Sequence, residues 1–269
     1  MEYTASEIEE ILLEPKVEYP TRSRKRAKVK EIRQKKQSRP YPNPKVKGQF
    51  PTSPAQVEPY LLPIYARNEA QEQFIWDLLH SEISFCSGIA GTGKTLLAVS
   101  HCVELLCRES VEKIILCRPA VEADEHIGFL PGGVREKLDP YLYPLYDALE
   151  QKLVHVPGGG KRLIESWITQ GMVEIAPLGY QRGRTFRNAA VLLDESQNAT
   201  YSQLKMFLTR IGENSHMVLT GDLGQSDIGW KSGYEEVLQR VYGSFPVVGF
   251  SEADCVRSEN CKVLTRLLV

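Results

Sequence analysis

From about residue 60 onward, short apolar runs alternate along the chain with longer segments that mix apolar and polar residues. Runs of this length that are apolar throughout are typical of strands buried on both faces of a parallel sheet. They predict six strands, at residues 83–86, 113–118, 172–176, 190–193, 216–220 and 247–250. The longer segments predict helices at residues 70–79, 94–107, 140–153, 160–169, 201–211 and 233–242. This alternation predicts an α/β fold with a mostly parallel sheet and helices on both faces.

The first 50 residues differ in composition from the rest of the chain. They hold 13 Lys and Arg against 7 Asp and Glu, whereas the remaining residues hold 20 against 27. Residues 22–47 carry 12 of those basic groups, a single acid and almost no apolar side chains. Such a segment buries too little apolar surface to offset the entropy lost on ordering. We therefore predict an N-terminal tail at residues 1–54, basic and disordered from about residue 21, followed by one domain at residues 55–269.

Two interpretations of this basic tail stay open. One-signed charge at this density favours an electrostatic arm that binds nucleic acid phosphates. A solvated linker that adds solubility is the alternative.

No run in the chain approaches the ~18 uninterrupted apolar residues of a membrane helix, and the acidic N-terminus lacks the apolar core of a signal peptide. The sequence therefore predicts a cytoplasmic protein with no membrane partner.

The first chemical motif is Gly-Ile-Ala-Gly-Thr-Gly-Lys-Thr at residues 88–95, between a predicted strand and a predicted helix. It has the Gly-x-x-x-x-Gly-Lys-Thr spacing of a phosphate-binding loop, or Walker A motif. Glycines let the backbone curl so that N–H groups point at phosphate oxygens, and the helix N-terminus favours an anion. The lysine neutralises the β- and γ-phosphates, and the threonine hydroxyl binds Mg²⁺. We therefore expect ATP and Mg²⁺ as cofactors, held by Gly88, Ile89, Ala90, Gly91, Thr92, Gly93, Lys94 and Thr95.

The second motif is the apolar strand at residues 190–193, which ends in Asp194 and Glu195. A carboxylate at the position of Asp194 can reach the coordination sphere of Mg²⁺. Glu195, the next residue, can orient or deprotonate an attacking water. This second acid disfavours a small-molecule kinase, which needs no hydrolytic base. The two motifs together predict a RecA-like P-loop ATPase domain, with Lys94, Asp194 and Glu195 as catalytic residues and with Thr95 and Asp194 as the metal ligands.

The strand at residues 216–220 is followed by two further polar candidates, Asp222 and Gln225. If this strand lies between the other two, its end faces the γ-phosphate, and both residues can sense whether ATP or ADP is bound. A turn that merely caps the next helix is the alternative. An arginine would also stabilise the charge on a transferred γ-phosphoryl group. The sequence does not choose among five arginines near predicted strand or loop ends: Arg118, Arg182, Arg184, Arg210 and Arg257.

Several longer motifs follow one another in order between residues 60 and 264. They include Cys-Arg-Pro-Ala-Val at 117–121, Ile-Gly-Phe-Leu-Pro-Gly at 127–132, Leu-Asp-Glu-Ser-Gln-Asn at 193–198 and Asp-x-Val-Arg at 254–257. Together with the Walker A motif, this set resembles the PhoH family, and the length is similar to that of minimal, phage-encoded members. The sequence departs from the family pattern at Ser196, Asp124 and Ser258, where the family has Ala, Gly and His.

The resemblance implies an ATPase related to the first motor domain of superfamily 1 helicases. Gln71 resembles the adenine-reading glutamine of such helicases, and Arg257 resembles the arginine of the final family motif. The ring assembly associated with the family implies a homo-oligomer such as a hexameric ring, in which an arginine of one subunit reaches the nucleotide of another. Gln225 and Arg257 are then expected to be catalytic residues too, and together with Asp222 to couple the nucleotide state to movement or to a partner.

Three uses of such an ATPase remain open. The basic tail and the helicase-like motifs favour remodelling of RNA or single-stranded DNA, although strong unwinding would require oligomerisation because a second RecA-like domain is not visible. The alternative is a slow nucleotide-dependent binding or scaffold protein without helicase activity. The third is a phosphotransferase that acts on a small metabolite, for which the sequence shows no substrate-binding insert. We expect the first use, with RNA or single-stranded DNA as the partner.

Overall fold

The computed structural model describes residues 50–120 and 134–258, with side chains from residue 141 onward in the second range. The predicted basic tail therefore lies almost wholly outside the described residues, and its disorder and its role stay predictions. The motif at residues 127–132 lies outside them as well. None of the helices in the described ranges is both long enough and apolar enough to cross a membrane.

The sheet contains six strands in the order β3-β2-β4-β5-β1-β6, and every neighbouring pair runs parallel. The strands are β1 (Ile83–Gly88), β2 (Lys113–Arg118), β3 (Val173–Pro177), β4 (Ala189–Leu193), β5 (His216–Gly221) and β6 (Val247–Phe250). The α/β fold with a parallel sheet is therefore confirmed, and each strand matches its predicted range within a few residues. β5 lies between β1 and β4, so the polar residues that follow these three strands meet at one edge of the sheet.

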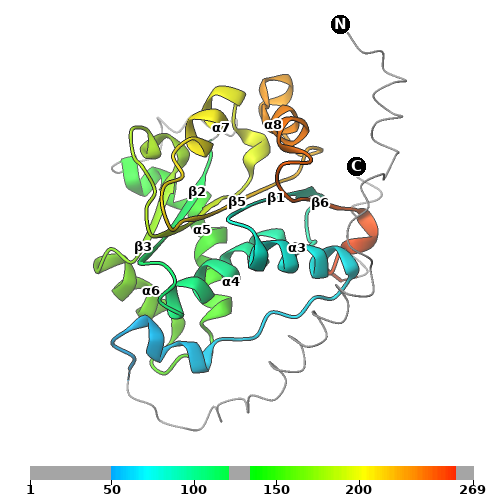
Figure 1. The fold of residues 1–269 in the computed structure, drawn as a ribbon. Helices are drawn as coiled ribbons and strands as arrows, with labels where there is room; N and C mark the ends of the chain where they lie inside the picture. Colours follow the sequence, from blue (N-terminus) through cyan, green and yellow to red (C-terminus); the bar gives the residue numbers. More distant parts are fainter. Residues whose placement is uncertain (1–49, 121–133, 259–269) are drawn as a thin grey trace, which may run out of the picture. The chain divides into compact units, whose positions relative to one another are not determined.

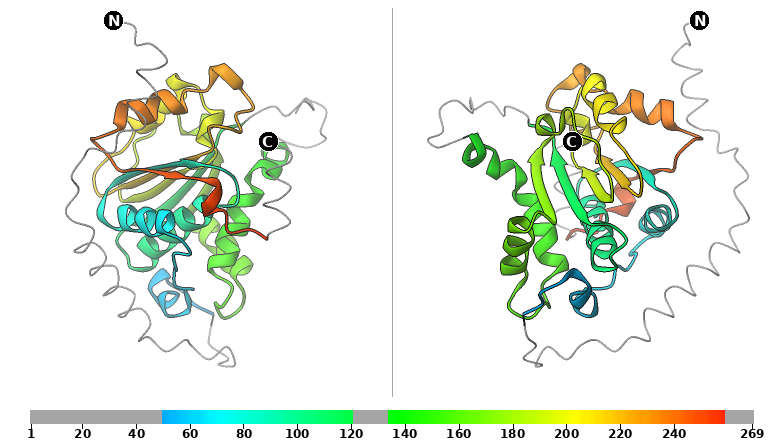
Figure 2. Two further views of the ribbon diagram at one scale, coloured as in Figure 1. Left: turned by 90° about the vertical axis from the view of Figure 1, so that its right-hand side faces the viewer. Right: turned by 60° about the vertical axis from the view of Figure 1, so that its left-hand side comes forward.

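Helices cover both faces of this sheet (Figures 1 and 2). On one face lie α3 (Glu69–His80), α4 (Lys94–Cys107), α5 (Val134–Lys152) and α6 (Gly160–Thr169), and on the other lie α7 (Tyr201–Leu208) and α8 (Tyr234–Val241). Each face has its own apolar core. The side chains of β4 alternate between them, with Ala190 and Leu192 in the core beside α4 and with Val191 and Leu193 in the core beside α7. This two-sided burial is why β4 is apolar at every position.

The start of α5 is the largest difference from the predicted elements. A start at Pro140 is favoured by the missing N–H of proline, which suits the first turn of a helix. That prediction is wrong, because the helix begins at Val134 and runs through both Pro140 and Pro144. A proline inside a helix removes one hydrogen bond to the preceding turn. In the turn before Pro144, the carbonyl of Tyr141 accepts a hydrogen bond from Nη1 of Arg118 at 3.3 Å, so a tertiary contact supports the helix there.

A buried ion pair joins α4 to α5. The Nζ of Lys152 lies 3.0 Å from Oε1 of Glu104 and also donates to the carbonyl of Leu62 at 2.5 Å. The Lys152 side chain is only 1% exposed. Glu104 also accepts from Nη2 of Arg108 at 3.2 Å. Removing one member of a buried pair is strongly destabilising, because the other charge stays buried with less compensation.

Lys152→Met is therefore expected to lower the free energy of unfolding by about 3 kcal/mol, since it leaves the Glu104 carboxylate buried without its ammonium partner. The double variant Lys152→Met/Glu104→Leu is expected to recover much of that loss. Urea unfolding followed by circular dichroism measures both. Lys161→Met is the matched control, because Lys161 is an exposed lysine at the start of α6. A loss that the double variant does not reduce would assign the effect to packing rather than to the buried charge.

Candidate active site

The loop between β1 and α4 has a backbone that depends on its glycines. Gly88, Gly91 and Gly93 have φ angles of +146°, +81° and +86°, which residues with a Cβ rarely adopt. A Cβ on Gly88 would lie 2.1 Å from the carbonyl oxygen of Phe250 in β6, so only glycine fits there. The loop leads directly into α4 at Lys94, and the first N–H groups of a helix have no acceptor within the helix. Such a loop and helix terminus form an anion-binding cradle.

Asp194, the first residue after β4, is the centre of the polar cluster beside this loop. Its Oδ1 accepts hydrogen bonds from the hydroxyls of Thr95, at 2.8 Å, and Thr220, at 2.5 Å. Asp194 is 2% exposed, so these contacts lie in a buried setting. The structure thus brings together Thr95 and Asp194, the two predicted metal ligands. Thr220 was not predicted in this role, although its position at the end of the neighbouring strand β5 was a usable signal.

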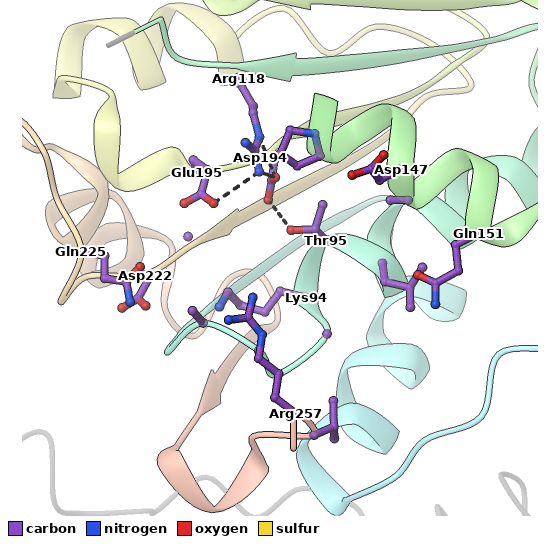
Figure 3. Close-up of a pocket in the computed structure, with 18 residues that line it drawn as sticks. Lys94, Thr95, Arg118, Asp147, Gln151, Asp194, Glu195, Asp222, Gln225 and Arg257 are labelled. Atoms are coloured by element: carbon purple, nitrogen blue, oxygen red, sulfur yellow. Dashed lines mark hydrogen bonds and ion pairs between the residues drawn. The ribbon is translucent and has the colours of Figure 1, made fainter. Parts of the chain in front are cut away.

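Arg118, at the end of β2, holds both acids of the second motif (Figure 3). Its Nε and Nη2 donate to Oδ2 of Asp194 at 2.9 and 2.6 Å, and its Nη2 also lies 3.3 Å from Oε1 of Glu195. The Arg118 side chain is 14% exposed, so the contact with Asp194 is largely shielded from water. Sequence reasoning named Arg118 as one of five arginines, and its place beside the two carboxylates comes from the neighbouring positions of β2 and β4.

Glu195 has an unusual backbone conformation for a residue that is not glycine. Its φ of +55° and ψ of +41° fall in the left-handed region, which is sparsely populated by residues with a Cβ. Such conformations cluster at functional sites, where the surrounding structure maintains them. The turn separates Glu195 from Asp194, since Asp194 is buried whereas the Glu195 side chain is 41% exposed. The two adjacent acids are therefore suited to different tasks.

Gln197 links Glu195 to the loop that follows β5. Its Nε2 donates to Oε2 of Glu195 at 2.7 Å and to the carbonyl of Gln225 at 3.2 Å. Its Oε1 accepts from the backbone N–H of Asp222 at 2.9 Å. Gln197 is 1% exposed, so its amide is fixed between the two segments. This residue carries a contact that the sequence motif alone did not reveal.

Asp222 has a buried carboxylate oxygen that is not satisfied within the described part of the chain. Its Oδ1 accepts from the backbone N–H of Gly224 at 3.1 Å. Its Oδ2 is buried, and among residues 50–120 and 134–258 it has no hydrogen-bond partner. A buried acceptor without a donor is costly, and this one belongs to a residue that lines the pocket described next.

These groups surround one pocket of about 590 Å³ (Figure 3). Lys94 lies at its base, where Nζ donates to the carbonyls of Gly88 at 2.5 Å and Ile89 at 2.8 Å. Asp147 and Gln151 of α5 lie across the pocket from Asp222 and Gln225 and were not predicted as site residues. The lining comprises Ala90, Gly91, Gly93, Lys94, Thr95, Leu96, Arg118, Pro144, Asp147, Ala148, Gln151, Asp194, Glu195, Gly221, Asp222, Gln225, Val256 and Arg257.

Comparison with known proteins places this site in a family. The family described as PhoH-like protein matches residues 63–268, which include every pocket residue. The chain belongs to the PhoH family. It is 43% identical to Protein PhoH of Escherichia coli K12 over 206 residues, which are 74% of this chain and 56% of that protein. It is 45% identical to a PhoH-like protein of Bacillus subtilis over 199 residues, 72% of this chain and 60% of that one. The chain thus spans little more than half the length of these curated PhoH relatives.

Two solved helicase structures are more distantly similar to this PhoH-family chain. The UvsW helicase of bacteriophage T4 has a TM-score of 0.39 and 14% identity, with 84% of this chain and 77% of that chain covered. A Pif1 helicase has a TM-score of 0.28 and 13% identity, with 70% and 44% covered. Scores this low carry no argument about the function of the PhoH-family site.

Two residues were predicted from the PhoH resemblance, and the structure places them differently relative to the pocket. Arg257 lines it, and a Cβ on Gly91 would lie 2.7 Å from Cδ of Arg257. Gln71 instead lies buried behind the loop, where its Nε2 donates to the carbonyl of Thr92 at 2.9 Å and its Oε1 accepts from the N–H of Arg67 at the same distance. Both polar ends of the Gln71 amide thus hold backbone groups, and its adenine-reading role stays a prediction.

The remaining candidate arginines do not line the pocket. Arg184 pairs with Glu174 of β3, and its hydrogen bonds lower the pKa of that carboxyl group. Arg182 is exposed on the loop before β4. The backbone of Arg210 bonds to Phe186, near the amino end of the sheet. The structure therefore leaves Arg118 and Arg257 as the predicted arginines at the pocket.

Behind the loop, two ionisable groups are held in their neutral forms. Tyr234 of α8 donates its hydroxyl to the carbonyls of Cys86, at 2.9 Å, and Leu219, at 3.1 Å, and burial raises its pKa well above the usual value. Burial likewise raises the pKa of the Cys86 thiol in β1. Both side chains therefore support the strands that position the site and have no acid–base role near neutral pH.

Proposed function

We propose that this PhoH-family protein binds ATP with Mg²⁺, hydrolyses it and couples the hydrolysis to RNA or single-stranded DNA. The observation that carries the proposal is the hydrogen-bonded cluster of Thr95, Asp194, Arg118 and Glu195 beside the phosphate-binding loop. It combines a hydroxyl, a buried carboxylate, a cation and a half-exposed carboxylate within one pocket. Each of these groups has a part in phosphoryl transfer to water.

The donor groups fit the two cofactors. Hydroxyl and carboxylate oxygens are the ligands that Mg²⁺ prefers, and Thr95 and Asp194 present both at hydrogen-bonding distance from each other. The curled loop and the first turn of α4 suit the phosphates of a nucleotide. When bound, Mg²⁺ would neutralise charge on the β- and γ-phosphates. Lys94 would supply a second positive charge from the base of the pocket.

The residues then divide the chemistry of hydrolysis between them. The oxygen of a water forms a bond to the γ-phosphorus, the bond from this phosphorus to the β–γ bridging oxygen breaks, and Glu195 accepts the proton of the water. Gln197 orients the Glu195 carboxylate through its 2.7 Å hydrogen bond. Arg118 holds the two acids in place through its hydrogen bonds to both and can stabilise negative charge on the γ-phosphoryl oxygens. Asp222, whose buried Oδ2 has no hydrogen-bond partner within the described residues, is a further carboxylate that lines the same pocket.

The coupling to nucleic acid is supported by the basic composition of residues 22–47 and by the helicase-like motifs. A slow nucleotide-dependent scaffold protein is the alternative. Assembly into a homo-oligomer such as a hexameric ring and a cytoplasmic location remain predictions from the sequence and the family resemblance.

Phosphate release from ATP is expected to require Mg²⁺ and to rise when single-stranded RNA or DNA is added. The measurement is steady-state phosphate release with uridine and thymidine 20-mers, with EDTA as the metal control and over a range of protein concentrations. A rate that is unchanged by either polymer would support the ATPase activity and contradict its coupling to nucleic acid. Tight nucleotide binding without turnover at any protein concentration would favour the scaffold alternative.

A further inference from the structure

An exposed tryptophan stands on the loop that leads away from the pocket. Trp230, in the 3₁₀ segment η6 (Gly229–Lys231), is 92% exposed. The other two tryptophans are less exposed, since Trp167 is 1% exposed and Trp76 is half-buried and stacks on His80 with ring centroids 3.7 Å apart. An indole this exposed leaves a large flat apolar surface in water, which is unfavourable unless a ligand covers it.

The loop that carries Trp230 is tied to the catalytic segment. At its start, Asp222 and Gln225 contact Gln197, which itself bonds to Glu195. Further along, Asn198 and Asp227 exchange two hydrogen bonds, from Asn198 Nδ2 to Asp227 Oδ2 at 2.7 Å and from the Asp227 N–H to Asn198 Oδ1 at 2.8 Å. A change in the position of the loop therefore acts directly on the residues around Glu195.

The far end of the loop is also anchored. The N–H of Gly233 donates to the carbonyl of Ala199 at 3.0 Å. A Cβ on Gly233 would lie 2.1 Å from the backbone nitrogen of Tyr201, so the loop returns in close contact with the start of α7. Trp230 and Lys231 therefore project from a loop that is held at both ends.

The chemistry around Trp230 fits a polyanion with flat bases. Nζ of Lys231 lies 6.0 Å from the centroid of the indole ring, which places a cation beside an exposed aromatic face. The other exposed positions of the loop before Trp230 include one large apolar residue, Leu223 at 42% exposure, together with Gly224, Gln225 and Asp227, and the Asp227 carboxylate is already engaged by Asn198. A stable protein interface would need a broader apolar surface. A nucleobase needs only one aromatic face and a neighbouring cation for its phosphate.

We propose that Trp230 and Lys231 form a contact site for single-stranded nucleic acid, in which a base stacks on the indole and Lys231 meets the adjacent phosphate. Occupancy of this site moves the loop and, through Gln197, adjusts the Glu195 carboxylate. The inference rests on the proposed coupling to nucleic acid and adds where the strand is contacted and how the contact reaches the ATPase site.

Tryptophan fluorescence of the full chain tests the stacking directly. Titration with a thymidine 12-mer is expected to quench the emission, and Trp230→Phe is expected to remove that quenching while keeping most of the affinity. Trp230→Ala is expected to weaken binding by about 5- to 150-fold, the range for loss of one stacked base. Trp76→Phe is the matched control, because Trp76 lies on α3, away from this loop, and is half-buried against His80. An abasic oligomer of the same length should bind without quenching.

The coupling is tested by the ratio of phosphate release with the 12-mer to release without it. Trp230→Ala is expected to reduce this ratio toward one at saturating oligomer. If wild type and variant are stimulated equally and bind equally well, the Trp230 site is overturned while the proposed function stands. If the oligomer stimulates neither, the proposed coupling itself fails. Light scattering on both proteins tests whether a second subunit, rather than nucleic acid, occupies this surface. If Trp230→Ala loses an assembly that the wild type forms, while its affinity for the oligonucleotide is unchanged, the surface binds a second subunit and the inference is overturned.

Discussion

Glu195→Gln is expected to lower kcat for ATP hydrolysis by about 10²- to 10⁴-fold, the range for removal of a general base. The substitution keeps the size of the side chain and an oxygen that can accept from Gln197, but it removes the group that takes the proton from water. Asp194, Thr95 and the phosphate-binding loop are untouched, so the Kd for Mg·ATP should change little. Steady-state phosphate release and nucleotide binding measured on the same samples separate the two quantities.

Glu235→Gln is the control for this experiment, since Glu235 is an exposed acid at the start of α8, outside the pocket. It should retain the wild-type kcat within about twofold, as expected for a surface change. If Glu195→Gln instead stays within tenfold of wild type, Glu195 is not the proton acceptor. Asp222 would then be the next acid to substitute, because it lines the same pocket and its Oδ2 has no hydrogen-bond partner within the described residues.

The sequence predicted the sheet well because the relevant signal is local. Strands such as β4 are apolar at every position, as burial on both faces requires. The phosphate-binding loop is equally readable, because its glycines and its lysine must stand at fixed spacing. By contrast, the start of α5 was misplaced, since proline favours a helix start but is tolerated inside a helix that tertiary contacts support.

The contacts within the site were less predictable than its residues. Arg118 and Asp194 are far apart in the sequence and meet because β2 and β4 are neighbours, which only the strand order reveals. The bridging role of Gln197 depends in the same way on β5 lying beside β4. Asp147 reaches the pocket from a helix that sequence reasoning did not connect with the site. Local patterns thus identified most candidate groups, and long-range topology decided which of them touch.

Arg118→Ala is expected to lower kcat by about 10²- to 10³-fold, the range for loss of one preorganised electrostatic group. The variant should also lose about 3 kcal/mol of stability, because the buried Asp194 carboxylate loses its cationic partner. The hydroxyls of Thr95 and Thr220 still donate to Asp194, so the protein should remain folded. Phosphate release, nucleotide binding and urea unfolding together measure these effects.

Arg118→Lys distinguishes a catalytic role from a purely structural one. It restores the positive charge beside Asp194, but a single ammonium cannot reproduce the forked contacts to both acids. Stability is therefore expected to recover more than kcat. Arg182→Ala, an exposed arginine outside the pocket, should leave basal turnover unchanged. If kcat recovers fully with stability in Arg118→Lys, the guanidinium only neutralises Asp194, and the stabilisation of γ-phosphoryl charge would pass to Arg257, the other predicted arginine that lines the pocket.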